Sequence, residues 1–169
     1  SMVCDLTIMK KKYADDHALC QELKPQAREL YAGLTEAIDK DTEAYNLVAA
    51  AFKMPKETDE DKAARKKAIA DGTLAATKVP LSVMKMGMQG LEIADKLYGH
   101  FNFNCASDFG VGVLNFLACI RGAWMNVKIN LPGVKDEEFA KAAEAEGKEI
   151  LAKGEEIANR LYKAIEEEL

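Results

Sequence analysis

The residues best suited to chemistry recur at helical spacing within residues 107–131, a long and largely apolar stretch. Four polar side chains share one face of a helix there, because residues three or four positions apart lie above one another. They are Asp108, Asn115, Asn126 and Asn130. Small residues fill the gaps between them, so this face offers one carboxylate and three amides to a ligand. The alternative is a helix crossing that is held together by amide hydrogen bonds.

A second carboxylate interrupts an apolar stripe in residues 31–52. The other members of this stripe are Tyr31, Leu34, Ile38, Tyr45, Val48 and Phe52. Asp41 therefore occupies a position at which a core residue is expected. A carboxylate that faces a core pairs with a cation, shifts its pKa upward or lines a polar cavity, and such groups are candidate acids or bases. We predict a functional role for Asp41, and a structural ion pair is the alternative.

Three consecutive lysines, Lys10, Lys11 and Lys12, follow a short apolar helical pattern at the start of the sequence. Runs of like charge usually form a solvated surface, which is the simplest interpretation here. The same lysines would bind an anionic ligand if they lay near a site.

The overall composition limits the classes of partner and cofactor. The net charge of −5 argues against nucleic acid as the main partner. His17 and His100 are isolated and the four cysteines contain no CxxC pair, so we expect no metal. The cysteines are consistent with reduced thiols in a cytoplasmic protein. Arg121 lies near the middle of the apolar run 107–131, which disfavours a membrane-spanning helix.

Long helices must position these residues, because no strand pattern and no internal repeat is present. We expect a single domain over residues 1–169, with an all-α fold in which an antiparallel bundle of long helices surrounds a buried central helix. The helices are expected over residues 25–53, 59–79, 81–97, 107–131 and 136–169. The long last helix and the apolar central helix offer more apolar surface than a small bundle hides, so a homodimer is expected.

Specific residues mark the helix ends. Pro25 suits the first turn of a helix, and Pro80 is expected to break or kink one. Thr58, three residues before Asp61, predicts a capping box. Ser107 or Asp108 is the expected N-cap of the central helix, and Asp136 caps the last one.

Four stretches together resemble the cyclodeaminase/cyclohydrolase family of folate one-carbon metabolism. They are SMVCDLTIMKKKY, DTEAYNLVAAAFKMPKETDEDKAARKKAI, VPLS and SDFGVGVLNFLACIRGAWMNVKINLPG. The resemblance implies an all-helical dimer with a folate pocket near the subunit interface. The motifs it assigns to that pocket are Asp-x-x-Ala-Tyr (Asp41, Tyr45), Ser-Asp (Ser107, Asp108) and Asn-Val-x-Ile-Asn (Asn126, Asn130).

The sequence departs from the family at its N-terminal end. Family members carry a Pro-Gly-Gly-Gly turn ahead of the Met-Val-x-x-Leu-Thr segment, so we expect the domain to be truncated there. A turn of this kind can present backbone amides to a ligand. Met9 also stands where relatives usually have glycine before the lysines.

The resemblance favours hydrolysis of 5,10-methenyltetrahydrofolate to 10-formyltetrahydrofolate, with a folate substrate and no further cofactor. Asp41 and Asp108 are the expected catalytic residues. The expected substrate-binding residues are Lys10, Lys11, Lys12, Tyr45, Ser107, Asn126 and Asn130. One alternative is a formiminotetrahydrofolate cyclodeaminase, which releases ammonia. The other is a catalytically silent helical protein that binds folate or a protein partner.

Overall fold

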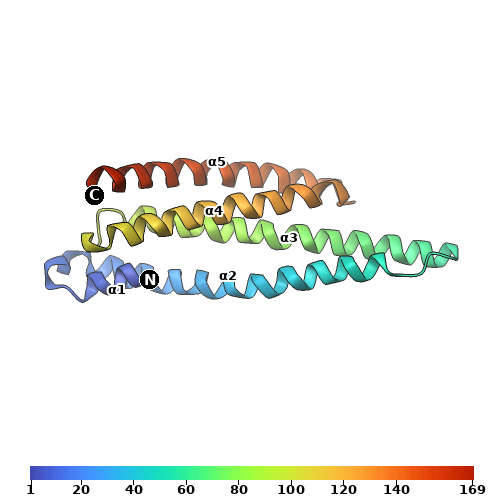
Figure 1. Ribbon diagram of the computed structural model, residues 1–169, viewed down its shortest axis with the longest axis horizontal. Helices are drawn as coiled ribbons and strands as arrows, with labels where there is room; N and C mark the ends of the chain where they lie inside the picture. Colours follow the sequence, from blue (N-terminus) through green and yellow to red (C-terminus); the bar gives the residue numbers. More distant parts are fainter.

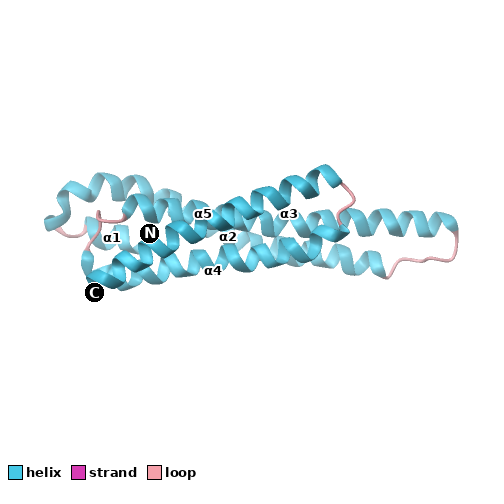
Figure 2. Ribbon diagram, turned by 90° about the horizontal axis from the view of Figure 1, so that it is seen from above, coloured by secondary structure: helices cyan, strands magenta, loops and turns pink.

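The computed structural model describes residues 1–169 and contains only helices (Figures 1 and 2). The α-helices are α1 (Met2–Ile8), α2 (His17–Phe52), α3 (Asp59–Leu97), α4 (Ala106–Asn130) and α5 (Glu137–Glu168). Short 3₁₀ segments are η1 (Lys11–Asp16), η2 (Phe103–Cys105) and η3 (Leu131–Gly133). The predicted all-α bundle of long helices is confirmed.

The four long helices run antiparallel along one axis, and the α2–α3 hairpin extends beyond the ends of α4 and α5 (Figure 1). The short helix α1 packs beside the start of α2, and both chain termini lie toward the same end of the bundle. The connections between α2 and α3 and between α4 and α5 therefore lie toward the opposite end.

Large aliphatic side chains from several helices form one core. The fully buried ones are Leu23, Met84, Leu91, Val113, Ile120, Val127 and Leu161. The helix α4 supplies three of them and packs against both α3 and α5. The apolar character of α4 therefore serves the core along its whole length.

The other flank of α4 is exposed within this chain. Val111, Leu114, Met125 and Ile129, which a fully buried central helix would place in the core, are 43 to 78% exposed. Residues Phe103–Gly133 also have the length and apolar composition of a membrane-spanning helix. A core helix gives the same signature, and α4 fills that role on its buried side. Neighbours cover α4 on one side only.

The stripe on α2 that was expected to face the core is exposed as well. Tyr31, Ile38, Tyr45 and Phe52 are 58 to 75% exposed. The buried side of the same helix carries alanines seven residues apart, at positions 37, 44 and 51. Small side chains let α2 approach α3 closely, so the alanines rather than the large residues form the contact. The prediction that the Asp41 stripe faces the core is wrong.

Two prolines lie inside helices rather than at their ends. Pro25 is within α2, which begins at His17, and α3 continues through Pro80. Pro80 has no N–H to donate to the Ala76 carbonyl, four residues earlier. The side-chain amide of Asn130 donates to that carbonyl at 2.9 Å. Because α4 satisfies the free carbonyl, α3 does not end at Pro80, and the two helices expected over residues 59–79 and 81–97 form one helix.

Two of the three predicted N-caps are confirmed. The Thr58 hydroxyl accepts from the Asp61 amide at 3.0 Å, and the Asp61 carboxylate accepts from the Thr58 amide at 3.1 Å. The Asp136 carboxylate accepts from the Phe139 amide at 2.9 Å. The third start is wrong, because η2 leads directly into α4 and places its first residue at Ala106.

Close packing of α5 on α4 generates a stability prediction. A Cβ at Gly147 would meet the Trp124 ring at 2.3 Å, whereas a Cβ at Gly110 would meet Ile165 at an ordinary 3.5 Å. Gly147→Ala should lower the free energy of unfolding by about 1–3 kcal/mol through overpacking. Gly110→Ala is the matched control and should raise it by about 0.5–1 kcal/mol. Urea denaturation measures both, and equal effects would contradict the packing described here.

Candidate functional site: a groove between α2, α3 and α4

Three helices enclose a groove of about 490 Å³ near the middle of the bundle. Helix α2 contributes Leu34, Ala37, Ile38, Asp41 and Thr42; α3 contributes Pro80 and Val83; α4 contributes Cys119, Ala123 and Asn126. Carboxylate, hydroxyl and amide groups thus share one groove with mainly aliphatic walls. Such a mixture suits a ligand that has a flat apolar body and a few polar atoms.

Asp41 is an exposed carboxylate that makes no ion pair or hydrogen bond within the chain. The adjacent Lys40 pairs with Glu36 instead, at 2.9 Å. The structural alternative, an ion pair that holds the bundle together, is therefore not present. Tyr45 lies one turn further along α2 and is exposed. The Asp41 carboxylate is free to accept a hydrogen bond from a ligand or from water.

Cys119 brings a thiol into the groove from α4. Burial raises the pKa of this thiol, because the charged thiolate loses its hydration. The thiol is accordingly neutral near pH 7 and is a poor nucleophile. It contributes a small apolar surface to the wall opposite α2.

The two asparagines of the Asn-Val-x-Ile-Asn motif have different environments. Asn126 is exposed, lines the groove and makes no hydrogen bond within the chain. The Nδ2 of Asn130 is committed to the Ala76 carbonyl beneath Pro80. Both polar atoms of the Asn126 amide are therefore available to a ligand. Asn130 instead has a structural role that was not predicted from the sequence.

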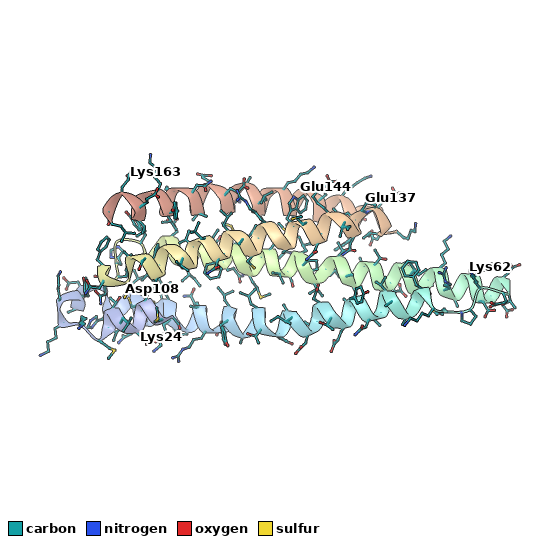
Figure 3. The ribbon with its side chains drawn as sticks, viewed as in Figure 1. Lys24, Lys62, Asp108, Glu137, Glu144 and Lys163 are labelled. Atoms are coloured by element: carbon teal, nitrogen blue, oxygen red, sulfur yellow. The ribbon has the colours of Figure 1, made fainter.

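Ser107 and Asp108 lie at the other end of α4 and are both exposed. Asp108 borders a separate cavity of about 260 Å³ with Met2, Leu30 and Phe116, and Figure 3 shows it at the end of the bundle near α1. It is about 27 Å from Asn126 along the helix axis at 1.5 Å per residue. One chain does not bring the two predicted carboxylates together.

The lysine run lies at the same end as Asp108. Lys11 and Lys12 belong to η1, and the carbonyl of Lys10 lies 3.1 Å from His17 Nε2. The chain from His17 to Asp41 advances about 36 Å along α2, which places the lysines far from the groove. All three lysines are exposed. They share an end of the molecule with Ser107 and Asp108.

Several residues that line the groove were not predicted from the sequence. Thr42, Val83 and Ala123 carry no chemical signal of their own, and Pro80 was interpreted only as a helix breaker. The VPLS stretch did contribute to the family resemblance, and it contains Pro80. No group of three His, Cys, Asp or Glu side chains is arranged to hold a metal ion.

Comparisons with known proteins agree with this architecture. A sequence profile described as formiminotransferase-cyclodeaminase matches residues 1–149. The chain is 36% identical over 165 residues to the methenyltetrahydrofolate cyclohydrolase of Methylorubrum extorquens, covering 98% of this chain and 79% of that protein. It is 32% identical over 139 residues to the formimidoyltransferase-cyclodeaminase of Sus scrofa, covering 82% of this chain and 26% of that larger protein.

A solved structure has the same fold. The crystal structure of formiminotetrahydrofolate cyclodeaminase from Thermotoga maritima matches with a TM-score of 0.85 and 27% identity, over 98% of this chain and 78% of that one. The fold and the groove define an antiparallel helical bundle with a groove between three helices, in which a few polar groups lie among mainly aliphatic walls. The chain belongs to the formiminotransferase-cyclodeaminase family, whose named relatives here are enzymes.

Asn126 and Asn130 allow a direct test of the contacts described for the groove. Asn130→Ala leaves the Ala76 carbonyl without a partner and should lower the free energy of unfolding by about 1–3 kcal/mol. Asn126→Ala removes no internal bond and should change it by less than about 0.5 kcal/mol. Chemical denaturation distinguishes them, and a stability loss confined to Asn126→Ala would contradict the assignment.

Proposed function

We propose that this protein hydrolyses 5,10-methenyltetrahydrofolate to 10-formyltetrahydrofolate. The observation that carries the proposal is the unpaired Asp41 carboxylate, which lines an aliphatic-walled groove opposite Asn126. The 36% identity to a methenyltetrahydrofolate cyclohydrolase over 98% of this chain supports the choice of substrate. Ring systems of this kind have flat faces that aliphatic walls can cover.

The reaction needs a base, an acid and oriented polar groups. Water attacks the carbon that bridges N5 and N10 and gives up a proton to the base. The hydroxyl of this adduct then loses its proton as the bond from that carbon to N5 breaks, N5 receives a proton, and the carbon remains on N10 as a formyl group. One proton is released overall. In this proposal Asp41 accepts the proton from water and Asn126 orients the reacting groups.

A second activity has specific support. The Thermotoga maritima structure with a TM-score of 0.85 is a formiminotetrahydrofolate cyclodeaminase. Cyclodeamination joins N10 to the formimino carbon and expels ammonia, so it needs an acid and benefits from excluding water. Assays of both substrates separate the two activities, since only the cyclodeaminase reaction releases ammonia.

The proposed catalytic role of Asp41 can be tested without disturbing the fold. Asp41→Asn keeps nearly the same volume and breaks no ion pair, so the unfolding transition should not move. Turnover should fall by about 100-fold or more if the carboxylate acts as the base. The measurement is loss of methenyltetrahydrofolate absorbance beside a thermal melt.

Asp39→Asn is the matched control for this variant. Asp39 is an exposed carboxylate on the same helix that does not line the groove. Its removal should leave turnover at the parental rate. Parental turnover in Asp41→Asn would remove Asp41 from the chemistry.

The active form in this proposal is a homodimer. The exposed apolar residues belong to α2 and α4, two of the helices that line the groove, and Ile38 lies in the groove itself. Contiguous unpartnered apolar surfaces are typical of association sites. A two-fold axis crossing α4 near its middle would bring Ser107 and Asp108 of one protomer toward Asp41 of its partner. This pairing would give both carboxylates a role in one site.

Subunit mixing tests the shared site. Asp41→Asn and Asp108→Asn homodimers should each be inactive, because every site lacks one carboxylate. A mixed dimer keeps one intact site, so an equimolar mixture exchanged to equilibrium should recover about one quarter of wild-type turnover. Mixtures that remain inactive although light scattering shows exchanged dimers would refute the shared site.

A further inference from the structure

A third cavity, of about 200 Å³, lies near the α2–α3 connection and is strongly cationic. Its lining residues are Lys56, Lys62, Arg65, Lys66, Ile69, Ala70, Gly133 and Lys135. Five of these eight side chains are basic and none is acidic. Figure 3 places Lys62 at the tip of the bundle, at the opposite end from Asp108. The catalytic proposal makes no use of this cavity.

The guanidinium of Arg65 is held in place from within the chain. It lies over the Phe52 ring at 5.5 Å, and its Nη2 donates to the Phe52 carbonyl at 3.4 Å. Its Nε is buried without a hydrogen-bond partner. A fixed guanidinium loses little conformational entropy when it binds an anion, and its planar donors match carboxylate and phosphate groups.

The neighbouring lysines are mostly free of internal partners. Lys62 pairs with Asp59 at 2.9 Å. Lys56, Lys66 and Lys135 also line the cavity, and none of them makes an ion pair within the chain. Like charges that converge on a concave surface repel one another, and an anion placed among them removes that repulsion. The positive charges of Lys56, Lys66 and Lys135 are therefore not neutralised by any carboxylate of the chain.

Lys135 reaches this cavity because the α4–α5 connection comes very close to α3. A Cβ added at Gly133 would lie 2.9 Å from the Thr73 methyl group, so only glycine allows this approach without a shift. Two segments distant in sequence, residues 56–70 and 133–135, are thus brought to one cavity by the fold.

We propose that this cavity binds a small anion that carries two or more carboxylate or phosphate groups. A volume of about 200 Å³ suits a small molecule, and the net charge of −5 disfavours a nucleic acid. The cavity is about 22 Å from the groove along α3, measured from Arg65 to Pro80. It is therefore a separate site, and its test does not depend on the proposed hydrolysis.

Calorimetric titration with pyrophosphate and with citrate, at matched ionic strength, tests the proposal on the full chain. At least one probe should bind saturably with one site per chain. The double variant Lys66→Gln/Lys135→Gln should weaken that binding by about tenfold or more, since charge-assisted bonds are lost. Preference for pyrophosphate would identify a phosphate site, and preference for citrate a carboxylate site.

Lys67→Gln is the matched control, because Lys67 is exposed, pairs with Asp71 at 2.7 Å and does not line the cavity. It should bind the probes as the parent does. Thermal melts show whether the double variant remains folded. Absence of saturable binding by either probe, or equal binding by the parent and the folded double variant, would overturn the proposal.

Discussion

The hydrogen bond from Asn130 to the Ala76 carbonyl holds together the part of the fold on which the groove depends. Pro80 removes one bond from the α3 ladder, and the C-terminal end of α4 replaces it with a side-chain amide. Helix α3 therefore remains continuous from Asp59 to Leu97 and presents Pro80 to the groove. A proline normally interrupts a helix. In this structure, the carbonyl that Pro80 leaves free links α3 to α4 through Asn130.

The second constraint is the alanine seam on α2. Alanines at positions 37, 44 and 51 let α2 lie close against α3, which leaves the large side chains of the same helix facing outward. Ala37 also lines the groove, and Asp41 follows one turn later. The contact between α2 and α3 thus opens the groove toward the exposed apolar surfaces of α2 and α4. The packing of the alanines against α3 therefore places Asp41, the candidate base, in the groove and leaves the apolar side chains of α2 exposed.

The sequence predicts the helices better than it predicts their faces. Thr58 and Asp136 mark helix starts because capping uses local hydrogen bonds, which a few adjacent residues determine. The orientation of α2 depends on which of two heptad stripes meets α3, and Tyr31 and Ile38 outweigh alanine in a hydrophobic pattern. The continuity of α3 through Pro80 was not predicted for a similar reason. The hydrogen bond to the free Ala76 carbonyl comes from Asn130, fifty positions after the proline in the chain.

The separation of the two predicted carboxylates is informative for the chemistry. Asp41 lines an open groove, while Asp108 is about 27 Å from Asn126, the α4 residue of that groove, so one chain supplies a single carboxylate to each place. Water in an open groove weakens every polar interaction with a substrate, and covering the groove strengthens them. A second protomer seated on the exposed faces of α2 and α4 would exclude that water and bring the second carboxylate at the same time. Association and activity would then be one property of this surface, because the residues that favour pairing border the residues proposed to carry the reaction.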